Sequence, residues 1–449
     1  MTARDRIVYL ECTTTFRHDQ GTGIPRVVRN VVRHFRALAP ARGFTAVPVY
    51  FEDGYFYRAP IDADGRLQSL LEGNDSETLH RRAQRRINRF ARALPQGPVR
   101  RFLSAPATAP GLANIVRSVV SGAQRLRASG SIGDGGERVH IRPQDVLFHI
   151  DLTAGIDMRP ALRALRAQGT FICAIINDVI PLRFVDIWPA EFVAPFRDWA
   201  ECMIGNADCI FTISQASKAD IEHVRQQMPE GSYPAGQVVE WFHLGHDMDL
   251  LDERAAPRAR LRDVFDSGVP VLLNVGWLDP RKNQRRLIVA LAELRRRGVR
   301  AKLLLVGKRG LGADAVFDDI RAHPRVRSDI HVFHGLSDAE LRFAFVNARA
   351  LVYPSYAEGF GLPLVEALMH RLPVFASDIR VFREIAGAYA VYFDPFDAMS
   401  IADVLEAFLV RGEYPPSRLR EPFAWISWED CVAHIIDLLQ QRLPHMVAA

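Results

Sequence analysis

The sequence predicts an α/β protein built of two halves, each with a mostly parallel, Rossmann-like sheet. The chain has 449 residues, and single hydrophobic cores rarely grow beyond about 250–300 residues. Short apolar runs alternate with amphipathic stretches, the usual pattern of parallel α/β sheets. A Gly-rich turn lies between a strand and a helix once in each half. We expect the halves over 1–250 and 269–425, with a polar connector over 250–268.

Six apolar runs in the first half have the length and composition of buried strands. They lie at 6–10, 44–51, 145–150, 170–176, 209–213 and 238–242. The first run leads into the turn Asp19-Gln-Gly-Thr-Gly-Ile-Pro-Arg26 and a helix. Backbone N–H groups around Gly21 and Gly23 suit phosphate, and Arg26 adds positive charge.

The regular alternation is interrupted between the second and third strands. Residues 52–66 are expected to form a hairpin or loop, and 80–136 an insertion. The insertion is basic, with Arg81, Arg82, Arg85, Arg86, Arg89 and Arg92 close together. It is either a solvated basic helix or a contact with an anionic membrane surface. Without interleaved aromatic side chains or a nucleic-acid-binding motif, we do not predict binding to nucleic acid.

The second half repeats the alternation more regularly. Its strands are expected at 269–275, 301–306, 330–333, 350–353, 372–376 and 390–393. The tail over 428–445 has the spacing of an amphipathic helix. Together these runs predict a second parallel sheet followed by one more helix.

The stretch from Tyr353 to Met369 in the second half combines the end of a strand, a Gly-rich turn and the start of a helix. A short strand leads into Glu358-Gly-Phe-Gly-Leu-Pro-Leu-Val-Glu366, where two glycines allow a sharp turn and Pro363 suits a helix start. Free N–H groups at such a helix start favour phosphate. Phosphate would repel the two glutamates, so we expect a carboxylate here to bind sugar hydroxyls. The stretch therefore predicts a pocket for a phosphorylated sugar.

The amino-acid composition indicates the class of protein and the cellular compartment that we expect for it. Apolar content of 48% and charged content of 24% are ordinary for a soluble globular protein. No run approaches the roughly 20 apolar residues of a membrane span, and we expect no secretory signal. The five cysteines lack CxxC spacing and are interpreted as core residues in a reducing cytoplasm.

The second half resembles the nucleotide-binding domain of retaining GT-B glycosyltransferases of the family-four type. The matching segments include Val275-Gly-Trp-Leu-Asp-Pro-Arg-Lys-Asn283, Leu304-Leu-Val-Gly-Lys308, His334-Gly-Leu-Ser-Asp338, Tyr353-Pro-Ser and the paired-glutamate motif ending at Glu366. Weaker matches lie at Thr22-Gly-Ile-Pro-Arg-Val-Val28, at Asp178 and at Thr212-Ile-Ser-Gln-Ala-Ser217. They suggest the subgroup that builds bacterial O-antigen, capsule or exopolysaccharide.

The resemblance implies a role for each motif. Lys282 and Arg281 would hold the donor diphosphate, Glu358 would contact the transferred sugar, and Glu366 the ribose. The turn would present backbone N–H groups, and Gly23 would approach the phosphates from the other domain. Further donor contacts are expected from Lys308, His334, Gly359, Phe360, Gly361 and Leu362. The catalytic set is then Glu358, Lys282 and Asp178.

Two positions depart from the family pattern. Trp277 stands where an Arg is common, so Arg281 is expected to substitute for it. Asn177 precedes Asp178 where many relatives have a His that contacts the donor sugar, so Asn177 or Asp178 is expected to act instead. On the acceptor side we expect Arg26, Asn177 and Ser214.

Other polar clusters have simpler interpretations. Asp62-Ala-Asp64 and Asp247-Met-Asp249 match a metal-binding DxD pattern, but we interpret them as a turn and a helix cap and predict no metal or cofactor. His149 and Asp151 either line a cleft between the two halves, or His149 is a satisfied histidine near the core. His243 and His246 are expected to be structural or acceptor-side, and Trp425 and Trp428 to pack where the last helix returns to the first domain.

The sequence therefore predicts a cytoplasmic glycosyltransferase, peripheral on the inner face of the membrane. It would transfer a hexose or deoxyhexose, with mannose or rhamnose as first choices, to a growing glycan or lipid-linked glycan. The donor would be a nucleotide-diphosphate sugar, and configuration would be retained. Two alternatives stay open: a nucleotide-sugar epimerase on a similar fold, and a non-catalytic nucleotide-sugar-binding subunit.

Overall fold

The computed structural model describes residues 6–19, 23–62, 64–70, 136–246, 256–323, 326–414 and 423–443. Contacts divide the chain into two compact units, 1–153 with 158–172, and 154–157 with 173–449. These units do not follow the two sheets, and the domain boundaries expected at 1–250 and 269–425 stay a prediction. The five cysteines are buried, and none of them forms a disulfide.

A seven-stranded sheet contains all six strands expected in the first half. Its order is β3-β2-β1-β4-β5-β6-β7. The strands are β1 (Arg6–Glu11), β2 (Phe44–Glu52), β3 (Tyr55–Arg58), β4 (Val146–His149), β5 (Phe171–Ile175), β6 (Cys209–Thr212) and β7 (Val238–Trp241).

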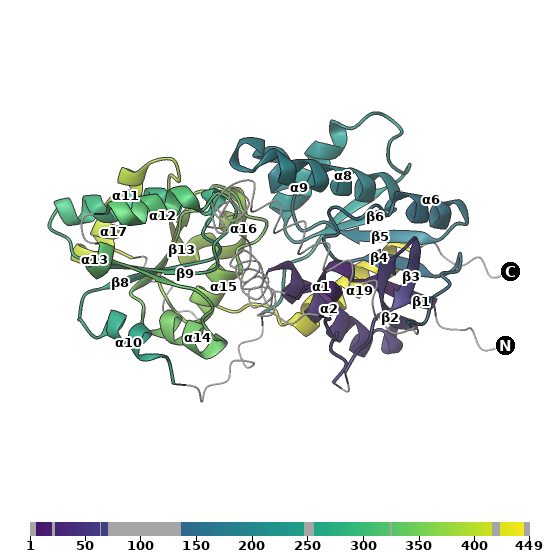
Figure 1. The fold of residues 1–449 in the computed structure, drawn as a ribbon, viewed down its shortest axis with the longest axis horizontal. Coiled ribbons are helices and arrows are strands. Elements are labelled where there is room, and N and C mark those ends of the chain that lie inside the picture. The colour runs from purple at the N-terminus through teal and green to yellow at the C-terminus, as the bar shows by residue number, and fades with distance from the viewer. Residues whose placement is uncertain are drawn as a thin grey trace, which may run out of the picture. The chain divides into compact units, whose positions relative to one another are not determined.

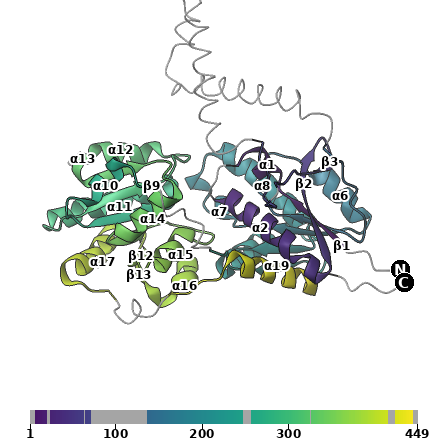
Figure 2. The same ribbon diagram turned by 90° about the horizontal axis from the view of Figure 1, so that it is seen from below.

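The helices that follow these strands include three that the sequence did not indicate, α1, α7 and α8. They are α1 (Thr13–Arg17), α2 (Ile24–Leu38), α6 (Arg159–Ala167), α7 (Ile180–Arg183), α8 (Ala190–Asn206) and α9 (Gln215–Gln226), with short 3₁₀ turns at Pro40–Arg42 and Val185–Ile187. Helix α2, which was expected after the Gly-rich turn, buries Val27, Val28 and Val31 and packs against β2 (Figure 2).

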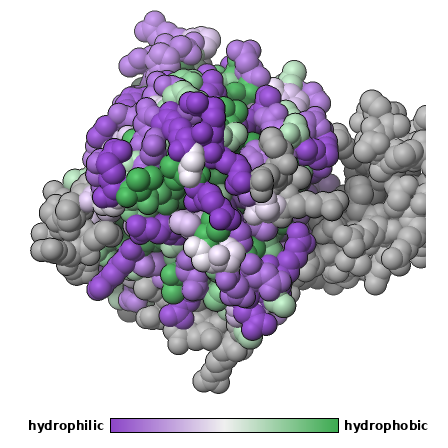
Figure 3. Space-filling view, turned by 90° about the vertical axis from the view of Figure 1, so that its left-hand side faces the viewer, coloured by the Kyte–Doolittle hydropathy of each residue, from purple (hydrophilic) through white to green (hydrophobic). Residues whose placement is uncertain are grey.

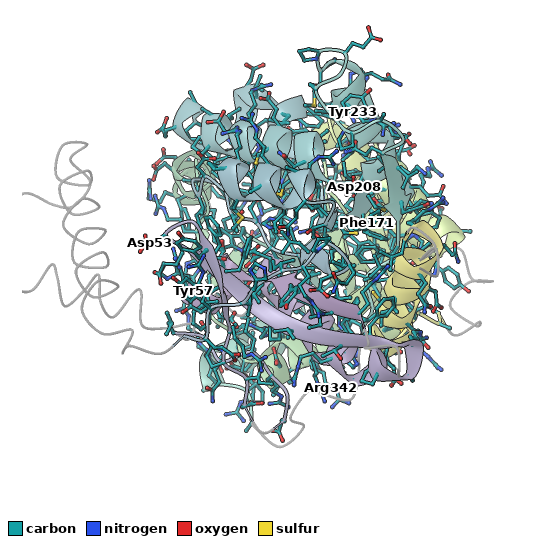
Figure 4. The ribbon with its side chains drawn as sticks, turned by 90° about the vertical axis from the view of Figure 1, so that its right-hand side faces the viewer. Asp53, Tyr57, Phe171, Asp208, Tyr233 and Arg342 are labelled. Atoms are coloured by element: carbon teal, nitrogen blue, oxygen red, sulfur yellow. The ribbon has the colours of Figure 1, made fainter. Side chains whose placement is uncertain are left out.

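The region expected to be a hairpin or loop contains both. Strand β3 pairs antiparallel with β2, and Asp53, at φ 48°, forms the hairpin turn (Figure 4). Tyr57 on β3 stacks on Tyr50 with ring centroids 5.5 Å apart. A second turn follows at Asp62, whose side chain accepts the Arg66 N–H. Asp62 thus acts as a turn residue, as expected.

A six-stranded parallel sheet of order β10-β9-β8-β11-β12-β13 forms the second half (Figure 1). Its strands are β8 (Val271–Val275), β9 (Lys302–Val306), β10 (Ile330–Phe333), β11 (Ala350–Tyr353), β12 (Val374–Ser377) and β13 (Ala390–Phe393). All six were predicted, because their continuous apolar runs suit a sheet that is buried on both faces.

Helices cover both faces of this sheet. Helices α11 (Gln284–Arg296), α12 (Asp314–Ala322) and α17 (Ala398–Arg411) build one core with the strands. On the other side lie α10 (Ala259–Phe265), α14 (Asp338–Asn347) and α15 (Leu362–Met369) (Figure 1). The remaining helical segments are η4 (Pro280–Lys282), α13 (Val326–Asp329), α16 (Arg380–Ala386), η5 (Gly387–Tyr389) and α19 (Trp428–Arg442). On the side that Figure 3 shows, the outer face of the second half is mixed, with hydrophobic patches among hydrophilic residues.

The last helix packs beside β7, as the resemblance implied. A Cβ on Gly245 would lie 2.4 Å from the Cα of Trp428, so the chain after β7 touches the start of α19. Arg442 forms an ion pair with Glu240 on β7. Trp428 is buried, and the Trp425 indole N–H donates to the Leu244 carbonyl at 2.7 Å. Both tryptophans therefore serve packing.

Buried acids and a histidine lie at the carboxyl ends of β1 and β4. His149 Nδ1 is 2.6 Å from Glu11 Oε2, and both side chains are buried. Burial, followed by the charge of Glu11, raises the pKa of Asp151 to about 7. Among the described residues, no helix combines the length and the apolar character needed to cross a membrane.

Candidate active site

The turn after β8 fixes the position of Lys282. Asp279 caps the short helix η4 by accepting the Lys282 N–H at 3.1 Å. Asn283 ends it with φ 56°, and the Asn283 amide donates to the carbonyls of Pro354 and Pro395 at 2.9 and 2.8 Å. The turn is thereby tied to the segments that follow β11 and β13.

Glu358 is held by two cations and a hydroxyl. Lys282 Nζ lies 2.5 Å from Glu358 Oε1, and Arg281 Nη1 lies 2.6 Å from Oε2. The Ser355 hydroxyl donates to Oε1 at 2.7 Å. Lys282 also donates to the Tyr353 hydroxyl at 2.8 Å. The cations and the glutamate that the sequence assigned to the diphosphate and the sugar therefore form one cluster.

The charges in this cluster are almost wholly buried. The side chains of Lys282 and Glu358 are 9% and 7% exposed. Burial alone would raise the pKa of Glu358, but the charges of Arg281 and Lys282 outweigh it and lower that pKa to about 2. Burial also lowers the pKa of Lys282, and Glu358 opposes this effect. The glutamate is thus ionised at neutral pH.

The glycine turn leads from Glu358 into α15. Gly361 is the N-cap residue of this helix at φ 108°, a conformation that glycine adopts without strain. Phe360 is buried against His243 and Trp425, with ring centroids 5.9 and 5.8 Å apart. Leu362 begins the helix, and Glu366 lies one turn later, 8% exposed. The helix start thus follows directly on the charged cluster.

Asp178 packs against this turn from the segment after β5. A Cβ on Gly359 would lie 2.8 Å from Asp178 Oδ2, so only glycine fits without movement. Asp178 Oδ1 accepts the Ile180 N–H at 3.0 Å. Burial raises the pKa of Asp178, and the charge of Arg281 opposes that rise. The adjacent Asn177 carbonyl accepts the Thr212 hydroxyl at 3.1 Å.

Ser214, expected on the acceptor side, is instead buried against the turn. It is the N-cap residue of α9, and its hydroxyl donates to the Gly359 carbonyl at 2.8 Å. Ser217 donates to the same carbonyl at 3.1 Å. His243 hydrogen-bonds Glu384, and His246 Nε2 lies 4.0 Å from Glu366 Oε1.

The other expected donor contacts lie at the ends of β9 and β10. Lys308 follows β9, and its carbonyl accepts the Leu278 N–H at 2.8 Å. His334 follows β10, is exposed, and hydrogen-bonds the Gly307 carbonyl through Nδ1. Trp277 is 38% exposed. These residues share the carboxyl edge of the sheet with Lys282, where α/β sheets place ligands.

Gly23 and Arg26 belong to the first compact unit and are described within it. Gly23 is exposed, is the N-cap residue of α2 and has φ 67°. Arg26 lies in the first turn of α2. Gly21 and Asp247-Met-Asp249 lie outside the described residues, as does the basic segment. In the described ranges, no group of three or more His, Cys, Asp or Glu side chains is placed to hold a metal ion.

Sequence reasoning missed several residues that surround the charged cluster, the glycine turn and the start of α9. Tyr353 and Ser355 were quoted only as part of a motif, yet both contact the charged groups. Ser217 lay in a recognised segment without a role, and Glu384 was not singled out. Helical spacing was the available signal for Ser217, because N3 of a helix faces back toward its N-cap.

The chain is similar to known glycosyl transferases. Residues 258–420 match the family described as Glycosyl transferases group 1. The chain is 31% identical over 319 residues to the serotype-specific mannosyltransferase WbdA of Escherichia coli, covering 70% of this chain and 38% of WbdA. The chain thus spans well under half the length of that relative.

Two solved structures share the fold. Sucrose-phosphate synthase of Thermosynechococcus elongatus superposes with a TM-score of 0.58 at 18% identity, covering 97% of this chain and 98% of the synthase. Anabaena HepE, solved in complex with UDP and glucose, gives 0.56 at 14% identity, covering 97% and 100%. At these identities the likeness concerns the fold alone. Through residues 258–420 the chain belongs to the glycosyl transferases group 1 family, and it has the two-sheet GT-B fold.

Proposed function

We propose that the protein transfers a mannosyl residue, with retention of configuration, from a nucleotide-diphosphate sugar to a growing bacterial surface glycan. Rhamnose is the second choice of sugar, and a lipid-linked acceptor is included in the proposal. The observation that carries it is the buried cluster of Arg281, Lys282 and Glu358 beside the Gly359–Gly361 turn.

The cations suit the leaving group. When the bond between sugar and phosphate breaks, negative charge develops on the diphosphate. Arg281 and Lys282 are fixed before the substrate arrives, and preorganised charges in a dry site stabilise such a transition state strongly. They supply positive charge without a metal ion, so the proposed reaction is metal-independent and needs no cofactor.

Glu358 suits the sugar. Its pKa of about 2 makes it a poor proton acceptor at neutral pH, because a general base works best with a pKa near the operating pH. An ionised carboxylate can instead stabilise positive charge on the reacting sugar carbon. In same-face transfer the leaving phosphate oxygen takes the proton of the acceptor hydroxyl, whose oxygen then bonds the sugar carbon.

The choice of sugar and pathway rests on the relatives. WbdA is named a serotype-specific mannosyltransferase, and a second relative, 28% identical over 240 residues, is the O-antigen chain mannosyltransferase B of Escherichia coli. Mannosyl transfer in O-antigen synthesis is therefore the substrate class that we propose for this chain. Lys308, His334 and Glu366 are proposed to bind the nucleoside, and Arg26 and Asn177 the acceptor.

A donor screen followed by a transfer assay tests the proposal. Purified protein is heated with GDP-mannose, dTDP-rhamnose or UDP-glucose, since a ligand of the folded state raises the melting temperature. The donor with the largest shift is then supplied with an O-antigen oligosaccharide, and mass spectrometry follows the addition of one hexose. Epimerised donor in the absence of acceptor would favour an epimerase. A protein that binds the donor but neither transfers the sugar nor slowly hydrolyses the donor would favour a binding subunit.

A further inference from the structure

Two hydroxyl groups at the start of α9 converge on one carbonyl of the glycine turn. Ser214 Oγ lies 2.8 Å and Ser217 Oγ 3.1 Å from the Gly359 oxygen. A carbonyl oxygen has two lone pairs and accepts two such bonds. Both serines are buried, at 0% and 2% exposure, so water does not compete for this carbonyl.

The serines are themselves held in place. The Ser217 N–H donates to Ser214 Oγ at 3.0 Å. Ser217 Oγ also lies 3.0 Å from Ser214 Oγ, and we assign the single Ser214 proton to the shorter contact, the one of 2.8 Å with the Gly359 carbonyl. The next free N–H groups of α9, on Gln215 and Ala216, donate to the Glu384 carboxylate at 2.8 and 3.0 Å. Glu384 also accepts a hydrogen bond from His243 at 2.8 Å, through a ring whose proton we place on Nε2.

The same glycine is also confined by Asp178, because a Cβ on Gly359 would lie 2.8 Å from Asp178 Oδ2. The peptide between Gly359 and Phe360 is trans, and in a trans peptide the C=O and N–H point in opposite directions. Fixing the Gly359 carbonyl toward the serines therefore aims the Phe360 N–H away from them. The next residue, Gly361, is the N-cap of α15.

We propose that Ser214 and Ser217 are positioning residues, which orient the Gly359–Phe360 peptide so that the Phe360 N–H and the start of α15 face the leaving phosphate. That the Phe360 N–H faces the leaving phosphate rests on the proposed function. That the two serines fix the Gly359–Phe360 peptide rests on the hydrogen bonds alone. Ser214 then acts through Gly359 and does not touch the acceptor.

The test uses the Ser214→Ala/Ser217→Ala double variant of the full chain, with two readouts. Hydrogen exchange measured by mass spectrometry on the peptide that covers 355–362 should be faster than in the wild type, since a released turn opens more often. With the best donor, kcat should fall about tenfold or more while KM changes less than about threefold, as expected when a transition-state contact is misaligned.

Controls separate this effect from general destabilisation. Ser427→Ala removes the N-cap serine of α19 in the same way, and should change neither readout. The Ser214→Thr variant, with Ser217 unchanged, keeps a capping hydroxyl, and its kcat should equal that of the wild type. Each single alanine variant should lose less than half of the double effect on the logarithmic scale, because the remaining hydroxyl still holds the carbonyl.

The outcomes are distinct. Unchanged exchange over 355–362 in the folded double variant overturns the inference, and so does faster exchange with unchanged kcat. If the wild type transfers no sugar, the proposed function fails, and the exchange data alone decide whether the serines hold the turn. Should the double variant not fold, the Ser217→Ala variant provides the same two readouts, and no change in either would overturn the inference.

Discussion

Lys282 Nζ lies 2.5 Å from Oε1 of Glu358, with both side chains almost completely buried. A buried ion pair contributes little net stability, because desolvation offsets the attraction, but removing one partner is costly. Such a pair is therefore better understood as a preorganised binding group than as a device for stability. Diphosphate arriving beside it would compete with Glu358 for the ammonium group.

Replacing Lys282 by Ala should weaken donor binding and turnover together. We expect kcat/KM to fall about a hundredfold or more, the usual cost of losing a fixed charge at the leaving group. Stability should fall by about 2–4 kcal/mol, because Arg281 still partly neutralises Glu358. Steady-state kinetics and urea unfolding measure the two effects. The surface variant Lys218→Ala is the control, and equal activity of both variants would contradict the role of Lys282.

Glu358→Gln should separate turnover from binding. The amide keeps the shape but not the charge, so the reacting sugar loses its counter-charge while both cations stay available to phosphate. We expect kcat to fall about a hundredfold, with nucleoside diphosphate bound at least as tightly in calorimetry. Asp378→Asn, at a surface ion pair with Arg383, is the matched control. A Glu358→Gln enzyme of normal kcat would remove this residue from the reaction.

Acid should destabilise the wild type more than Glu358→Gln. The folded pKa of Glu358, about 2, lies below its ordinary value of 4.5. The native state therefore binds fewer protons than the unfolded state between these values, and stability is lost as pH falls through this window. The stability difference between the two proteins should be largest at neutral pH and shrink below pH of about 4.5. A difference in unfolding free energy that stays constant from pH 7 to pH 3 would refute the ion pair.

Gly359→Ala should disturb the turn through Asp178. The added Cβ would lie 2.8 Å from Asp178 Oδ2, closer than side chains normally approach. We expect a lower melting temperature and a kcat reduced about tenfold or more. Adding Asp178→Ala should recover part of the lost melting temperature, because it removes the clash. Gly298→Ala is the control for activity. Its Cβ meets nothing within 4 Å, so it should lower the melting temperature only through backbone strain at φ 83° and leave kcat unchanged.

The basic segment gives a prediction that lies outside the described residues. Charge reversal of Arg81, Arg82, Arg85 and Arg86 should weaken sedimentation with vesicles that contain anionic lipid, since each basic residue near such a surface contributes about 1 kcal/mol. Binding to neutral vesicles is the control. Equal sedimentation of the variant and the wild type would exclude the membrane contact and leave the solvated basic helix as the interpretation of this segment.

Much of the fold was predictable because a short, uninterrupted apolar run indicates a buried strand. Strands such as β8 and β11 are buried along their whole length, and their sequences contain little else than aliphatic side chains. Strand β3 was expected only as part of a hairpin or loop, because it has four residues at a sheet edge and only Phe56 among them is buried. Helix α10 was taken as part of the connector, since seven residues rich in Arg give a weak helical pattern.

The candidate site was predictable only where chemistry follows directly from residue type. Lys282, Arg281 and Glu358 were singled out, and the structure brings them together. Their mutual contact was not foreseen, because 76 residues separate Lys282 from Glu358 along the chain. Ser214 was expected at the acceptor and lies on the Gly359 carbonyl instead. Such a contact depends on tertiary packing, which single-residue chemistry does not encode.

The central claim is that this cluster transfers a sugar with retention, and NMR of the first product tests it most directly. The wild type is incubated with the donor chosen by thermal shift and an O-antigen acceptor. The one-bond C1–H1 coupling at the anomeric carbon of the new linkage is compared with that of the donor, because the H1–H2 coupling of mannose and rhamnose is small in both anomers. We expect the same anomeric configuration in donor and product, and no product from Lys282→Ala. An inverted linkage, or equal product from the Lys282→Ala enzyme, would contradict the account.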